Sequence, residues 1–99
     1  MQFTWDRKKA AKNLEKHKVS FEEAKTVFDD VNHIVHSDSD NAEGEVRITV
    51  LGFSSRTRVL FVVAFEVEVG DGEEDLIRII GARRAESQEE IQYATERQE

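Results

Sequence analysis

Arginine is the side chain in this sequence that is best suited to hold an anion, because its planar guanidinium keeps its charge and donates two parallel hydrogen bonds. Arg78 stands between Ile77 and Ile79 in an alternating segment, so its side chain points away from theirs. By the same alternation, Arg47 and Arg58 lie on the less aliphatic faces of their own strands. If helices cover the isoleucine face, three strands bring guanidinium groups to one open surface that suits a phosphate.

Four other residues are candidates for the same chemistry. His17 exchanges protons near neutral pH and suits acid–base work, but it equally fits a helix end where its ring binds exposed carbonyl groups. Tyr93 is suited to donate a proton rather than to accept one, and it equally fits a packing role. Arg83 and Arg84 follow the last predicted strand, where sheet ends often carry sites, and one of them can instead close the entry to the final helix.

The charges of this chain are segregated. The 99 residues include 14 Lys and Arg against 21 Asp and Glu, and the net charge of -7 alone argues against non-specific nucleic-acid binding. However, residues 7–18 hold six basic residues and one acidic residue, whereas residues 66–75 hold six acidic residues and no basic one. The acidic segment predicts a solvated hairpin. The basic segment suits the steering of an anionic partner through its mobile lysines: Lys8, Lys9, Lys12 and Lys16.

Several classes of protein are excluded by composition. The absence of cysteine rules out a disulfide framework, thiolate catalysis and cysteine-ligated zinc. His33 and His36 are three residues apart on a weak strand and face opposite ways, so we expect no metal and no other cofactor. No apolar run approaches the roughly 20 residues of a membrane span. The N-terminal residues contain no apolar stretch of signal-peptide length, so we expect a cytoplasmic protein without membrane contact.

Local signals predict the helices that must position these side chains. Asp6 is the expected N-cap of a helix that runs to about residue 16. Ser20 and Glu23 have the spacing of a capping box, which opens a second, short helix. Ser87 and Glu90 have the same spacing and open a last helix that runs to about residue 98.

The strands follow from alternation of apolar and polar residues, and they set the fold class. The predicted strands are residues 3–5, 32–37, 46–53, 58–69 and 76–82, of which 32–37 is the weakest. Because short turns join most consecutive strands, we expect one α+β domain over residues 1–99 with an antiparallel four- to five-stranded sheet, two N-terminal helices and one C-terminal helix. We expect the N-terminal helices to pack on the face formed by Val59, Phe61, Val63, Phe65 and Val67.

The motifs of the chain resemble a known family, the BrnT-type toxins of bacterial type II toxin–antitoxin pairs. The resemblance is carried, in the family's order and spacing, by Phe3-x-Trp5-Asp6-x-x-Lys9, Asn13-x-x-Lys16-His17, Val19–Ala24, Val27–Asp30, Glu45-x-Arg47, Gly52, Arg58, Ile77–Ala85, Glu90 and Tyr93. Three positions depart from the family pattern, because Lys18, Val31 and Gly81 stand where Gly, Pro and Ser are usual.

The resemblance implies a RelE-like ribonuclease fold, a block of translation and a cognate antitoxin of the ribbon-helix-helix DNA-binding type. Metal-independent RNA cleavage needs a base for the 2′-hydroxyl, cations for the phosphorane and an acid for the leaving oxygen. We expect the catalytic residues to be Arg58, Arg78, Arg83, Tyr93 and His17. We expect Lys8, Lys9, Lys12, Lys16, Arg47 and Arg84 to bind RNA.

The same resemblance implies how partners assemble. Two toxins per antitoxin dimer is the simplest count, and DNA would be contacted only through the antitoxin. The alternative is a non-catalytic binding module of the same fold that acts with its DNA-binding antitoxin in autoregulation. Net charge -7 and the absence of an obvious general base favour this alternative.

Overall fold

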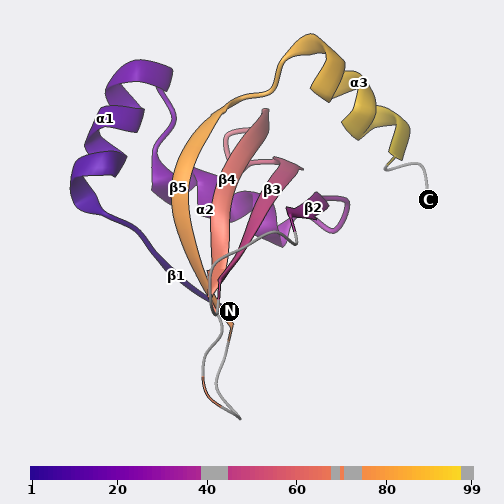
Figure 1. The fold of residues 1–99 in the computed structure, drawn as a ribbon. Helices are drawn as coiled ribbons and strands as arrows, with labels where there is room; N and C mark the ends of the chain where they lie inside the picture. The colour runs from indigo at the N-terminus through magenta and orange to yellow at the C-terminus, as the bar shows by residue number, and fades with distance from the viewer. Residues whose placement is uncertain (39–44, 68–69, 71–74, 97–99) are drawn as a thin grey trace.

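The computed structural model describes residues 1–38, 45–67, 70 and 75–96, so most of the acidic segment 66–75 and the predicted helix end near residue 98 lie outside the described residues. Four consecutive strands and a short N-terminal strand form one five-stranded sheet, with helices before and after the run of four (Figure 1). The elements are β1 (Gln2–Thr4), α1 (Arg7–His17), α2 (Phe21–Lys25), the 3-10 helix η1 (Thr26–Asp29), β2 (Ile34–Asp38), β3 (Glu45–Phe53), β4 (Val59–Val67), β5 (Leu76–Arg84) and α3 (Ser87–Glu96). The weak strand near residues 32–37 is therefore present as β2.

The sheet is mixed, so the prediction of an antiparallel sheet is wrong for one strand. Its order is β1-β5-β4-β3-β2, in which β2 to β5 pair antiparallel and β1 pairs parallel with β5. The antiparallel expectation rested on short turns between consecutive strands. It does not apply to β1, because the neighbour of β1 is the last strand and not the next one.

The helices begin where the local signals predict, but two of the expected side-chain contacts differ. Asp6 accepts a hydrogen bond from the backbone N–H of Lys9, and Ser20 accepts one from that of Glu23. The Glu23 side chain does not return to Ser20 but pairs with Arg58 instead. The last helix begins at Ser87, and the reciprocal contact comes from Glu89, which accepts from the backbone N–H of Glu86. The side-chain contact at the start of this helix therefore lies one residue earlier than the predicted pair of Ser87 and Glu90.

The N-terminal helices cover the opposite face of β4 from the one predicted. Leu60, Val62 and Ala64 are fully buried in the core, whereas the predicted face is only partly buried. Both faces of β4 are apolar, so alternation within β4 does not distinguish them. The register does, because Ala64 pairs with Ile79 and Val62 pairs with Val50, which lie on the apolar faces of their own strands.

Asn13 fastens α1 to the edge of β5. Its Nδ2 donates to the carbonyl groups of Ala82 and Val19 at 2.8 and 2.9 Å, and its Oδ1 accepts from the backbone N–H of Ala82 at 3.1 Å. Because β1 pairs with β5 only as far as Arg78, Asn13 satisfies edge groups that β1 does not reach. This contact keeps the basic helix beside the strand that carries Arg78 and Arg83 (Figure 1).

The third helix, α3, lies near β2 and β3, whereas α1 lies beside β5. It is on the sheet face opposite the one that α1 and α2 cover. Gln92 of α3 contacts His36 of β2, and Tyr93 lies beside Phe53 and Val59. In the described part of the chain, no helix is long and apolar enough to cross a bilayer.

Candidate functional site

The sheet face away from α1 and α2 carries arginines in register with aromatic rings. Phe65 of β4 pairs with Arg47 on one side and Arg78 on the other, and Phe61 pairs with Arg83. Arg78 and Arg83 are five residues apart, so regular alternation would send them to opposite faces. The register of β4 and β5 shifts between Val63 and Ala64, and this shift returns Arg83 to the face of Arg78.

Arg78 is held from two directions. Its guanidinium lies over the Phe65 ring, 5.2 Å from the ring centre. Its Nη1 and Nη2 donate to the two carboxylate oxygens of Glu45 at 3.0 and 3.1 Å. The Arg78 side chain is 38% exposed and that of Glu45 is 28% exposed, so solvent reaches the pair. The guanidinium is therefore oriented but not enclosed.

Arg83 repeats this arrangement one step along the sheet. Its guanidinium lies 4.4 Å from the centre of the Phe61 ring, and its Nη1 and Nη2 donate to Glu89 at 2.9 Å each. The hydrogen bonds from Arg83 hold the pKa of the Glu89 carboxyl below its ordinary value, against the opposing effect of burial. Glu89 also accepts from the backbone N–H of Glu86, so one carboxylate serves Arg83 and the first turn of α3.

The chemistry of this face is that of fixed cations above a half-apolar surface. A guanidinium on an aromatic ring gains cation–π attraction of about 0.5–1 kcal/mol at exposed sites, which favours one orientation. Cations held in place before a reaction stabilise developing negative charge more effectively than mobile ones. Between the two arginines the face is open at Gly81, where an added Cβ would meet nothing within 4 Å. A serine therefore fits at this departure from the family pattern.

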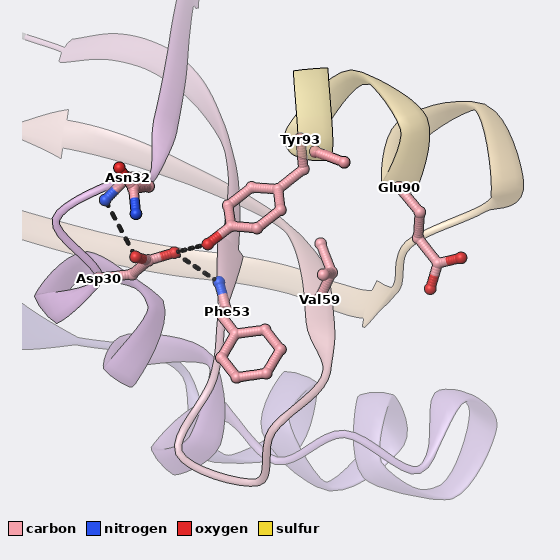
Figure 2. Close-up of a pocket in the computed structure, with 7 residues that line it drawn as sticks. Asp30, Asn32, Phe53, Val59, Glu90 and Tyr93 are labelled. Carbon is pink, nitrogen blue, oxygen red and sulfur yellow. Dashed lines mark hydrogen bonds between the residues drawn. The ribbon is translucent and has the colours of Figure 1, made fainter. Parts of the chain in front are cut away.

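Tyr93 does not join the arginines but turns toward Asp30. The Tyr93 hydroxyl donates to Asp30 Oδ2 at 2.5 Å, at the edge of a pocket of about 460 Å³ (Figure 2). Asp30 also accepts from the backbone N–H groups of Phe53 and Asn32, both at 2.9 Å. Burial raises the pKa of Asp30, but the hydrogen bond from Tyr93 and the two backbone bonds outweigh burial and lower it. Tyr93 is buried, which agrees with the packing interpretation.

The expectation that Arg58 shares the open face with Arg78 is wrong. Arg58 donates through Nε and Nη2 to Glu23 at 2.8 and 2.7 Å, and through Nη2 to the Lys18 carbonyl at 3.0 Å. These partners belong to the N-terminal helices, which cover the core face. Alternation within its own strand correctly placed Arg58 on the face away from Phe61. That face is the one that the N-terminal helices cover.

The remaining predicted residues do not lie on the arginine face. His17 ends α1 on the helix side of the sheet, next to Lys18, whose φ of 61° ends the helix in the left-handed region. Arg84 pairs with Leu60, a core-facing residue. The lysines of α1 are exposed: Lys8, Lys9, Lys12 and Lys16.

Within the described ranges, no three His, Asp or Glu side chains gather in a way that could hold a metal ion.

Sequence reasoning did not identify the partners of the arginines and of Tyr93. Glu45, Glu89 and Asp30 were not candidates, and Phe61 and Phe65 were assigned to the core. The four-residue spacing of the two phenylalanines on a strand, which puts both on one face, was the available signal. The pairing of these rings with arginines depends on the register between neighbouring strands, which cannot be read from the spacing of residues within one strand.

Comparison with known proteins agrees with the resemblance seen in the motifs. The family described as "Ribonuclease toxin, BrnT, of type II toxin-antitoxin system" matches residues 5–89. No curated protein matches the chain. The matched residues include β2 to β5 and the first turn of α3, and thus all the arginines considered above.

Proposed function

The chain belongs to the family of BrnT ribonuclease toxins of type II toxin–antitoxin systems, and from this premise we propose that it is an endoribonuclease that cleaves mRNA and blocks translation. The family description places a ribonuclease and a toxin in one chain and implies a cognate antitoxin. The observation that carries the proposal is the pair of guanidiniums, Arg78 and Arg83, each fixed over a phenylalanine ring on one open face.

In the proposed reaction, the 2′-oxygen of a ribose attacks the adjacent phosphorus. The 2′-O–P bond forms and the P–O5′ bond breaks, which leaves a cyclic 2′,3′-phosphate and a 5′-hydroxyl. The attacking hydroxyl loses its proton to a base, and the leaving oxygen gains one from an acid. The phosphorane between these states carries about two negative charges. Arg78 and Arg83 supply the fixed positive charge for it, and Arg47 lies across Phe65 from Arg78.

The acid that protonates the leaving oxygen is proposed to be Tyr93. Tyr93 donates its hydroxyl proton to Asp30, and it would serve as acid only after this bond opens. We leave Arg58, His17 and Arg84 outside the site, because Arg58 pairs with Glu23, His17 ends α1 and Arg84 lies opposite a core residue. In this proposal, catalysis rests mainly on electrostatic stabilisation by the arginines.

We assign the lysines of α1 to the capture of RNA. They are exposed on a helix that packs along β5, the strand that carries Arg78 and Arg83. Long, mobile ammonium groups raise the local concentration of an anionic strand without fixing its geometry. In this proposal, a chain of net charge -7 approaches RNA through one basic helix.

The proposed partner is an antitoxin of the ribbon-helix-helix type. Such proteins dimerise through paired strands, so two toxins per antitoxin dimer is the simplest assembly. In this proposal the toxin contacts DNA only through the antitoxin, and both proteins act in the cytoplasm, where mRNA is translated.

A second candidate function is a non-catalytic module of the same fold. It is favoured by the carboxylates that already occupy Arg78 and Arg83, and by the engagement of Tyr93 with Asp30. Induced expression of the chain in a bacterium separates the two functions. We expect growth arrest, loss of protein synthesis and cleaved mRNA, all reversed by the co-expressed antitoxin. Normal growth at verified soluble expression would favour the non-catalytic module.

A further inference from the structure

Both arginines of the proposed site are occupied by carboxylates of the same chain. Glu45 meets Arg78 and Glu89 meets Arg83, each through two N–H···O bonds of 2.9–3.1 Å. A carboxylate presents two oxygens to a guanidinium much as a phosphate does. The resting face therefore holds two internal anions where RNA phosphates are proposed to bind.

The orientation of the arginines does not depend on the carboxylates alone. Each guanidinium also lies over a phenylalanine ring of β4, at 5.2 Å for Arg78 and 4.4 Å for Arg83. Removal of a carboxylate charge thus leaves the ring contact in place and exposes the full positive charge. Because the side chains of both ion pairs are between 20% and 38% exposed, an external anion can reach them.

We infer that Glu45 and Glu89 screen the site: they neutralise Arg78 and Arg83 until RNA phosphates take their place. This inference rests on the proposed function. The two arginines pair with Phe65 and Phe61, which are four residues apart on β4, so they lie about 13 Å apart. A ligand displaces both carboxylates only if it carries phosphates along the same line. Isolated anions, which replace one carboxylate at a time, bind only weakly.

The screen also connects the site to α3. Glu89 lies in the first turn of α3 and accepts from the backbone N–H of Glu86 as well as from Arg83. A glutamine at this position can still accept the backbone bond, since glutamine is a normal member of a capping box. Glu89→Gln therefore removes the charge that faces Arg83 and retains the cap. Glu45→Gln removes the charge that faces Arg78 at the start of β3.

The test is a binding titration with the full-length chain. The probe is a short fluorescein-labelled single-stranded RNA in which every 2′-hydroxyl is methylated, so that it cannot be cleaved. The variants are Glu45→Gln, Glu89→Gln and their combination. The matched control is Glu66→Gln, which removes the same charge from the residue after Phe65, whose side chain alternates to the other face. Anisotropy is measured over a series of salt concentrations.

Each single variant is expected to bind the RNA about three- to fivefold more tightly, which is the upper part of the range that exposed ion pairs contribute. The double variant should bind roughly tenfold more tightly, and its salt dependence should steepen by about 0.7 for each further phosphate that the arginines neutralise. The control should remain within about twofold of wild type.

The outcomes separate the screen from the proposed function. If the two variants bind RNA no better than Glu66→Gln, or more weakly, the carboxylates do not screen the site and the screen is overturned, while the proposed function stands. If the wild type and every variant fail to bind RNA at all, the arginine face is not an RNA site and both fall. Circular dichroism of Glu89→Gln checks that α3 is retained.

Discussion

The Arg58 guanidinium forms a two-bond ion pair with the Glu23 carboxylate, and this pair links the N-terminal helices to the β3–β4 hairpin. Arg58 donates to both oxygens of Glu23, at 2.8 Å from Nε and 2.7 Å from Nη2. Ser54 donates to the same carboxylate at 2.6 Å. Only 3% of the Glu23 side chain is exposed, so its charge depends on these donors. The hydrogen bonds from Arg58 hold the pKa of Glu23 below its ordinary value despite burial.

Arg58→Ala is expected to destabilise the protein by about 2–4 kcal/mol, because it leaves a buried carboxylate without its cation. The range lies below that for a fully buried pair, since 20% of the Arg58 side chain is exposed. Urea denaturation at pH 7 measures the effect. The double variant Glu23→Gln/Arg58→Ala should recover part of the loss. A single variant within about 0.5 kcal/mol of wild type would show that the pair is not structural.

Arg78→Ala is expected to abolish toxicity and to lower kcat for RNA cleavage by about 10²–10³, as loss of one transition-state cation does. Arg56→Ala is the matched control, since Arg56 is exposed in the turn between β3 and β4. Both variants should melt close to wild type, because a partly exposed ion pair contributes at most about 1 kcal/mol. Full activity of Arg78→Ala would remove Arg78 from the reaction.

Tyr93→Phe is expected to lower the free energy of unfolding by about 1.5–3 kcal/mol at pH 7, since it removes a hydrogen bond to a charged carboxylate. The pKa of Asp30 is lowered in the folded protein, so its contribution is complete above its ordinary value of 3.8 and is lost as the pH falls below that value. The difference between wild type and Tyr93→Phe should therefore shrink below about pH 4. Urea unfolding between pH 7 and pH 3 measures it, and a constant difference would contradict the assignment.

Lys18→Gly is expected to stabilise the protein by about 0.5–1 kcal/mol, because a glycine adopts the left-handed conformation without strain. Lys18 has a φ of 61° and ends α1, and its backbone N–H donates to the Leu14 carbonyl. The substitution also removes the bond from Lys18 Nζ to the Glu15 carbonyl, which is exposed and contributes little. Thermal denaturation measures the increase in stability. A lower melting temperature would mean that this bond outweighs the strain.

Lys12→Ala is expected to weaken RNA binding only about two- to fivefold, because a mobile surface cation steers the ligand without fixing it. The slope of log affinity against log salt should become shallower by about 0.7, the value for one neutralised phosphate on a single strand. The same titration with 2′-methylated RNA measures both quantities. A loss as large as that of Arg78→Ala would shift the chemistry to α1.

Local chemistry was sufficient for the starts of the first two helices and for the positions of most strands. Asp6 and Ser20 bind the backbone N–H groups three residues ahead, and this contact needs no other part of the chain. The alternation in β3, β4 and β5 is likewise a property of each strand alone. The family motifs could be identified for the same reason, since they are residue types at fixed spacing.

Tertiary structure decided which faces and partners these residues meet. Both faces of β4 are apolar, and only pairing with β3 and β5 assigns Leu60 to the core and Phe61 to the open side. The register shift between β4 and β5 brings Arg83 to the same face as Arg78, and the parallel partner of β1 is β5, at the far end of the chain. Arg58 meets Glu23 across 35 residues. Contacts between distant segments depend on register and packing, which spacing along one segment does not encode.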